Sequence, residues 1–132
     1  MCIRDRLLQN ETALQAEAVA IGAARGLRVI YSAAPFSAEA VRAVLPHVSL
    51  LVMNAGEAEA LCAAMGCLPP VEMVVTRGAD GAEWIGAEPL RVPAYKVTAV
   101  DTTGAGDCFT GTLAAGLDAG MPRVQALSLI HI

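Results

Sequence analysis

The feature that most constrains the fold of this chain is the alternation of short apolar segments with segments patterned like helices. Residues 7–11, 27–31 and 49–53 are typical of strands, and helical spacing follows each of them. Alternation of this kind is typical of βα units built around a parallel sheet. The sequence therefore predicts an α/β fold.

Local signals predict where the helices begin and end. Thr12 and Gln15 have the spacing of a capping box, and Ser37 is suited to cap a helix over 38–45. A third helix is expected over 56–65, ending near Gly66. In the first helix, apolar residues recur at helical spacing at Leu14, Ala18, Ile21 and Ala24 or their neighbours, before a stop at Gly26.

The pattern changes after residue 68. Strands are predicted at 71–76, 82–85, 90–93 and 96–100 without helices between them, which indicates a short antiparallel meander. A helix over about 105–118 and another starting near Pro122 follow. We expect part of a doubly wound, three-layer α/β/α fold with a mostly parallel sheet, and we expect Trp84 and Phe109 in its core.

Composition excludes several classes of partner. The 132 residues include nine basic and thirteen acidic side chains, and the basic ones form no run that could follow a nucleic-acid backbone. No apolar run approaches the roughly 18–20 residues that span a bilayer. The charged start, "MCIRDR", does not resemble a secretory signal, so we expect a cytoplasmic protein without membrane or nucleic-acid partners.

The stretch "VDTTGAGDCFTG" (100–111) places a glycine-rich turn between a strand-like segment and a helix start. Backbone amides at such a turn can point at an anion, and Gly104, Ala105 and Gly106 carry little bulk to obstruct it. The turn lacks the lysine of a phosphate-binding P-loop and the third glycine of a dinucleotide-binding fingerprint. Anion binding of a different type is indicated.

Asp107 does not fit a simple phosphate site, because its carboxylate would repel the anion. One interpretation is that it takes the proton of a hydroxyl that attacks a phosphoryl group. The other is that it only stabilises the helix N-terminus, where acids are favoured. The residue alone leaves both interpretations open.

Three motifs, placed in the family's order, resemble the ribokinase-like (PfkB-type) carbohydrate kinases. "DTTGAGDCFTG" is similar to the C-terminal signature of that family, "NAGE" (54–57) to its NxxE motif, and "TRGADG" (76–81) to its nucleotide loop. "LLQNE", "LRVIYSAAP" and "LPHVSLLVMN" resemble the ribokinase branch. The resemblance covers residues 7–127, so we expect 1–6 and 128–132 to be tails foreign to the gene.

The resemblance implies a role for each matched residue. Asp107 would be the catalytic base, with the amides of Gly104, Ala105 and Gly106 as the anion hole. Mg²⁺ and the phosphates would be organised by Asn54 and Glu57, and K⁺ by Asp101 and the carbonyl of Thr103. The nucleotide would be bound by Thr76, Arg77, Gly78, Ala79, Asp80 and Gly81, together with Gly106 and Asp107.

Simpler roles remain open for several of these residues. Asn54 at a strand end is often only a cap, Glu57 is an ordinary acid for a first helical turn, and "RGADG" alone is an everyday hairpin turn. Arg77 is more typical of a solvated turn arginine than of a phosphate ligand, and Cys108 of a small buried residue.

The implied reaction is transfer of a phosphoryl group from ATP to a sugar hydroxyl, with ribose as the leading acceptor. Other pentoses, hexoses, 2-keto-3-deoxysugars and nucleosides stay open, as does a non-catalytic nucleotide-binding or regulatory module of the same fold. Relatives are often dimers. Because the sugar-binding half and part of the adenine site are not in this sequence, we expect the 132-residue chain alone to lack turnover and to be prone to aggregate.

The expected foreign tails give a prediction at the level of the gene. The open reading frame should continue beyond both ends of the chain when the genomic locus is sequenced. In-frame stop codons directly flanking the codons of residues 1 and 132 would contradict it.

Overall fold

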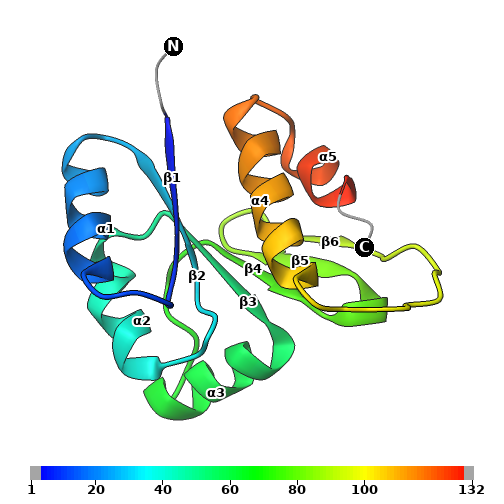
Figure 1. The fold of residues 1–132 in the computed structure, drawn as a ribbon, viewed down its shortest axis with the longest axis horizontal. Helices are drawn as coiled ribbons and strands as arrows, with labels where there is room; N and C mark the ends of the chain where they lie inside the picture. The colour runs from blue at the N-terminus through cyan, green and yellow to red at the C-terminus, as the bar shows by residue number, and fades with distance from the viewer. Residues whose placement is uncertain (1–3, 130–132) are drawn as a thin grey trace.

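The computed structural model describes residues 4–129, which form one mixed sheet with helices on both faces (Figure 1). The six strands lie in chain order, with β1 to β4 parallel and β5 and β6 antiparallel. The strands are β1 (Asp5–Gln9), β2 (Arg28–Ser32), β3 (Leu50–Asn54), β4 (Met73–Thr76), β5 (Ala82–Ile85) and β6 (Leu90–Val92). The predicted α/β fold with an antiparallel meander is confirmed.

The helices form the two outer layers. One face of the sheet carries α1 (Gln15–Ala24), α2 (Ala38–Val44) and α3 (Ala55–Met65), and the other carries α4 (Ala105–Asp118) and α5 (Arg123–Ser128) (Figure 1). Two short 3₁₀ turns, η1 (Leu45–His47) and η2 (Gly78–Asp80), complete the elements. All three βα crossovers from β1 to β4 therefore lie on the same face.

The central strands are apolar throughout because both of their faces are covered. In β3, Leu51 and Met53 pack into the core cluster beneath α1, α2 and α3, while Leu50 and Val52 pack into the cluster beneath α4 and α5. Side chains alternate between the two faces of a strand, so each cluster receives every second residue. A continuous apolar run in the sequence is thus the signature of a strand buried on both sides.

The start of α1 differs from the prediction. The helix begins at Gln15, after Leu14, which has a left-handed backbone (φ 68°), and no side chain caps it. Instead of completing a capping box with Thr12, the Gln15 side chain donates to Asn10 Oδ1 at 3.5 Å. The capping-box prediction was wrong because the turn after β1 occupies the residues that the pattern assigned to the helix.

The buried face of α1 is formed by neighbours of the apolar positions named from the sequence. Leu14 and Ile21 are about half to two-thirds exposed, whereas Val19 and Gly22 are buried. A Cβ on Gly22 would lie 3.2 Å from Arg6 Cδ and 3.3 Å from Val29 Cγ2. The helix therefore approaches the sheet through a glycine, a contact that a count of apolar residues does not reveal.

Other local signals are confirmed. Ser37 caps α2 by accepting a hydrogen bond from the Ala40 amide at 3.3 Å, and α3 ends at Gly66, whose φ is 81°. Trp84 and Phe109 are buried in the core. Helix α4 has the expected bounds.

The predicted strand at 96–100 is absent, because residues 93–99 run without regular structure. Pro93 directly follows β6 and has no amide proton to continue the ladder. The segment that follows is mostly exposed and lies along the surface between the sheet and α4. Its β-branched residues are typical of a strand, but in the described sheet this segment pairs with no neighbouring strand.

Gly81 fixes the path of this segment. Its φ is 96°, and an added Cβ would lie 2.0 Å from the Val92 carbonyl oxygen and 2.8 Å from the Ala94 nitrogen. The backbone on either side of Pro93 therefore passes directly over Gly81, and a glycine is required there for both conformation and space.

A polar cluster joins α5 to the sheet. The guanidinium of Arg123 stacks 4.5 Å above the Trp84 ring, and its Nη1 lies 3.5 Å from Glu72 Oε2. Glu72 accepts hydrogen bonds from the Trp84 indole and from the Ala87 amide, and these bonds lower the pKa of its carboxyl. The carboxylate thus links β4, β5 and α5.

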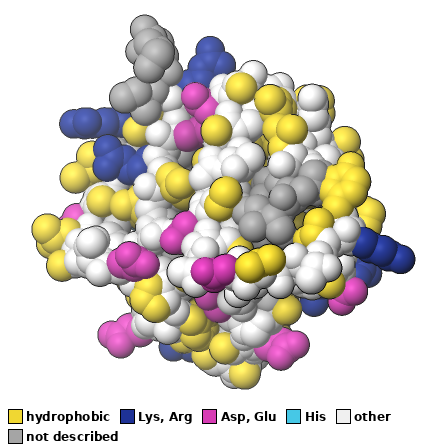
Figure 2. All heavy atoms as spheres, turned by 45° about the vertical axis from the view of Figure 1, so that its right-hand side comes forward, with side chains coloured by type: hydrophobic (Ala, Val, Ile, Leu, Met, Phe, Trp, Pro, Cys, Tyr) yellow, Lys and Arg dark blue, Asp and Glu magenta, His cyan; other side chains and the backbone are white. Residues whose placement is uncertain are grey.

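The surface carries charges of both signs. On the face shown in Figure 2, acidic side chains are spread over the middle and basic ones lie towards the margins. No helix within residues 4–129 is long and apolar enough to cross a membrane. Of the tails expected to be foreign, residues 1–3 and 130–132 lie outside the described residues, while Asp5 and Arg6 belong to β1 and Ser128 to α5.

The close approach at Gly81 gives a stability prediction. Gly81→Ala should lower the free energy of unfolding by more than about 2 kcal/mol, because it adds both a clash and a strained backbone. Gly26→Ala is the matched control, since its φ is 72° with nothing within 4 Å of an added Cβ, and it should cost about 1 kcal/mol. Urea unfolding of both variants measures the difference, and equal losses would contradict the predicted clash.

Candidate active site

The carboxyl ends of the parallel strands gather the predicted site residues at one edge of the sheet. Strand β3 ends at Asn54 and β4 at Thr76, and these two residues are directly paired in the register of the sheet. The first turn of α4 lies at the same edge. In open α/β sheets, ligands bind outside the carboxyl ends of the strands, so this edge is the candidate site.

The turn before α4 is held by its own polar groups. Asp101 Oδ1 accepts a hydrogen bond from the Thr103 amide at 2.8 Å, and the Thr102 carbonyl accepts one from the Ala105 amide at 3.1 Å. The Thr103 amide, followed by its hydroxyl, lowers the pKa of the exposed Asp101 carboxyl. Gly104 has φ 72°, a conformation that favours glycine. The hydrogen bonds between Asp101 and Thr103, the predicted cation ligands, thus help to form this turn.

The amides at the start of α4 are not equivalent. The Ala105 amide already donates to Thr102, so an anion would have to compete with that turn for it. Gly106 and Asp107 lie in the first helical turn, where amides have no acceptor within the helix. An added Cβ on Gly106 would meet nothing within 4 Å, so its lack of a side chain leaves space above the helix end. The Asp107 amide joins the candidate anion donors that sequence reasoning named.

Asp107 lies exposed in this first turn and has one long-range partner. Gln9 Nε2, at the end of β1, donates to Asp107 Oδ1 at 2.6 Å. Sequence reasoning missed Gln9, because the two residues are 98 positions apart and nothing in a strand-end glutamine identifies its partner. Cys108, expected to be buried, is exposed, since the buried face of α4 begins only at Phe109.

Asn54 and Glu57 form a complete capping box at the start of α3. The Glu57 amide donates to Asn54 Oδ1 at 2.8 Å, and the Asn54 amide donates to Glu57 Oε2 at 2.9 Å. The simpler role left open for this motif is therefore present in the structure. The capping box uses only one of about four acceptor positions on the Glu57 carboxylate.

The glycine turn after β4 forms η2. Gly78 has φ 55°, and the Asp80 amide donates to the Arg77 carbonyl at 3.0 Å. The Arg77 side chain forms a hydrogen-bonded ion pair with Glu83 Oε2 through Nη2 at 2.9 Å and Nε at 3.1 Å. Arg77 is thus held on the neighbouring strand β5 and braces the turn.

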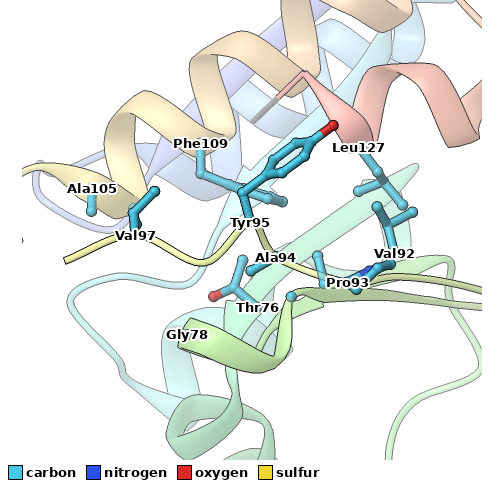
Figure 3. Close-up of a pocket in the computed structure, with 13 residues that line it drawn as sticks. Thr76, Gly78, Val92, Pro93, Ala94, Tyr95, Val97, Ala105, Phe109 and Leu127 are labelled. Carbon is cyan, nitrogen blue, oxygen red and sulfur yellow. The ribbon is translucent and has the colours of Figure 1, made fainter. Parts of the chain in front are cut away.

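A hollow of about 160 Å³ joins this turn to the start of α4 (Figure 3). Five predicted residues line it, from both glycine-rich segments: Thr76, Gly78, Gly81, Ala105 and Gly106. Ala79 and Asp80 are exposed outside it. Its remaining walls were not predicted, and they come from Ala82, the 92–95 segment with Val97, Phe109 and Leu127. These walls are mostly apolar, as in pockets that bind a flat organic group.

Metal-ligating side chains are sparse. Within residues 4–129, no three His, Cys, Asp or Glu side chains are grouped closely enough to hold a metal ion. Glu57 and Asp101 stand at the starts of different helices. Any cation here would need backbone oxygens, water or a ligand to complete its coordination.

A comparison with known protein families identifies the family of this chain. Residues 5–129 match the profile of the family described as pfkB family carbohydrate kinase. The chain belongs to this family. The three motifs of the PfkB pattern thus lie at one edge of the sheet, two of them around a single hollow.

Individual PfkB relatives share parts of the chain. It is 40% identical over 58 residues to a ribokinase of Lactococcus lactis, covering 43% of this chain and 19% of that protein. It is 31% identical over 135 aligned residues to an adenosine kinase of Schizophyllum commune, covering 78% of the chain and 39% of that protein. The chain thus spans less than half of either relative.

A solved structure agrees with the fold. The ribokinase of Cryptococcus neoformans in complex with ADP is 28% identical, with a TM-score of 0.83, over 94% of this chain and 50% of that one. The three-layer architecture is therefore that of the ribokinase-like kinases.

The capping box gives a prediction for Asn54. Asn54→Ala should lower the free energy of unfolding by about 1 kcal/mol, because the Glu57 amide loses its acceptor. Asn54→Ser keeps an acceptor at the cap and should stay within about 0.5 kcal/mol of the wild type. Thermal or urea unfolding measures both, and an Ala variant as stable as the Ser variant would show that the cap contributes nothing.

Proposed function

We propose that this chain is the nucleotide-binding and catalytic part of an ATP-dependent kinase that phosphorylates a sugar hydroxyl, with ribose as the leading acceptor. The observation that carries the proposal is the single hollow lined by Thr76, Gly78 and Gly81 of the nucleotide loop and by Ala105 and Gly106 beside Asp107. The related ribokinase was solved in complex with ADP, which supports nucleotide use by this chain.

The apolar walls of the hollow suit an adenine ring. Val92, Pro93 and Ala94 lie on one side and Phe109 and Leu127 on the other, as Figure 3 shows. The phosphates would then extend towards the first turn of α4, where the amides of Gly106 and Asp107 and the positive end of the helix dipole favour negative charge. This arrangement places the γ-phosphate near the Asp107 carboxylate.

Asp107 acts as the general base in the proposed reaction. The acceptor oxygen forms a bond to the γ-phosphorus while the bond from that phosphorus to the β,γ-bridging oxygen breaks. ADP leaves with the bridging oxygen, and the hydroxyl proton passes to the Asp107 carboxylate. The amides at the start of α4 stabilise the charge on the transferring phosphoryl group.

The donors present fit the two cations that we propose. Glu57 retains acceptor positions beyond the one used by the Asn54 amide, and with Asn54 it would hold Mg²⁺ through water. Mg²⁺, when bound, neutralises charge on the phosphates. Asp101, which has about four acceptor positions, and the Thr103 carbonyl would contribute to a K⁺ site that also steadies the turn before α4.

Acceptor choice rests on the relatives. Ribokinase and adenosine kinase both occur among them, so pentoses and nucleosides are the first acceptors to compare. The chain covers half or less of these proteins, so we propose that further segments supply most sugar contacts. We also propose that the complete protein is a cytoplasmic enzyme and a dimer. The second candidate is a non-catalytic nucleotide-binding module.

The proposed base gives the central prediction. In the protein encoded by the complete reading frame that contains this chain, Asp107→Asn should lower kcat for sugar phosphorylation by roughly 10²–10⁴-fold. ATP affinity should stay within about twofold, because the substitution keeps the Asp107 amide, the group proposed to face the phosphates. Coupled ADP release with ribose, other sugars and nucleosides measures kcat, and calorimetry measures ATP binding.

The same assays separate the two candidate functions. Nucleotide binding without Asp107-dependent phosphorylation of any acceptor would favour the binding module. The 132-residue chain is expected to lack turnover by itself. Phosphorylation of ribose by that chain, lost on Asp107→Asn, would show that the chain is sufficient for catalysis.

A further inference from the structure

One contact at the candidate site has no part in the function proposed so far. Gln9 Nε2 lies 2.6 Å from Asp107 Oδ1, a short hydrogen bond between the end of β1 and the first turn of α4. It connects an element at one edge of the sheet with the helix that carries the candidate base. Asp107 is otherwise exposed, so this bond is a specific restraint on its carboxylate.

Gln9 is well placed to act as a restraint, because its backbone is fixed. It is the last residue of β1 and is paired with Ser32 of β2 in the parallel ladder. The next residue is also tied down, since the Asn10 amide donates to the Ala34 carbonyl at 3.0 Å and Asn10 Nδ2 donates to the Pro35 carbonyl at 2.7 Å. A half-buried side chain on such a strand end has few alternative positions.

The chemistry of an amide suits this position. A primary amide does not titrate in the working pH range, so Gln9 can orient the carboxylate without exchanging a proton with it. By donating to Oδ1, it occupies that oxygen and leaves Oδ2 to face the acceptor hydroxyl. When the proton arrives, the same bond favours its placement on Oδ2.

We propose that Gln9 is a positioning residue that orients Asp107 for proton transfer from the acceptor. This proposal rests on the proposed kinase function. Gln9 is not expected to contact ATP, since it is not among the residues lining the hollow. Its loss should therefore affect turnover and leave nucleotide binding intact.

The first test compares two glutamine variants in the protein encoded by the complete reading frame. Gln9→Leu should lower kcat by about 10- to 100-fold, because the base is no longer held in a productive orientation. The KM values for ATP and for the acceptor should change by less than about threefold. Gln125→Leu, on the exposed side of α5, is the matched control and should leave kcat unchanged.

A second variant separates orientation from packing. Gln9→Glu keeps the size and shape of the side chain but replaces the donor with an acceptor that faces the Asp107 carboxylate. It should lower kcat at least as much as Gln9→Leu, and urea unfolding checks that both variants remain folded. A Gln9→Glu variant with wild-type kcat would overturn the proposal.

The decisive measurement is the double variant with Asp107→Asn. If Gln9 acts only through Asp107, adding Gln9→Leu to Asp107→Asn should change the residual rate by less than about twofold. A further loss as large as that in the wild-type background would overturn the positioning role. An active wild type with a fully active Gln9→Leu variant refutes this inference alone, whereas a wild type that phosphorylates no acceptor refutes the kinase function and this inference with it.

Discussion

Burial of the central strands on both faces is the constraint on which the candidate site depends. Every side chain of β3 from Leu50 to Met53 is committed to one of two core clusters, so the first polar side chain stands at the strand end. Parallel pairing then sets Asn54 beside Thr76. In β3 polar chemistry is confined to the carboxyl end of the strand, because Leu50 to Met53 are buried.

The site draws on both helical layers as well as on the sheet. The capping box belongs to α3 on one face, and the glycine-rich turn with Asp107 opens α4 on the other. The Gln9 hydrogen bond ties the α4 turn to β1, the hollow beside Gly81 ties it to the turn after β4, and Asn54 of the capping box is paired with Thr76. The proposed base, anion donors and nucleotide walls are thus held by elements distant in sequence, and their relative positions depend on the packing of the whole domain.

Sequence patterns predicted the features that depend on interactions between residues close in sequence. The strand and helix order, the Ser37 cap, the stop at Gly66 and the extent of α4 follow from spacing and from single-residue preferences. Three motifs also indicated most residues at the site edge. The register of α1 on the sheet, the path of residues 93–99 and the partner of Asp107 depend on contacts between distant segments, including close approaches at Gly22 and Gly81. No local pattern encodes such contacts.

The stacking of Arg123 on Trp84 makes the intrinsic fluorescence of the chain sensitive to the position of α5. Trp84 is the only tryptophan, it is 3% exposed, and its indole lies between the Glu72 carboxylate and the guanidinium contributed by α5. Its fluorescence therefore follows the docking of the last described helix on the sheet. The same helix places Leu127 in the wall of the hollow. The emission of Trp84 therefore also reports on the integrity of the proposed adenine pocket.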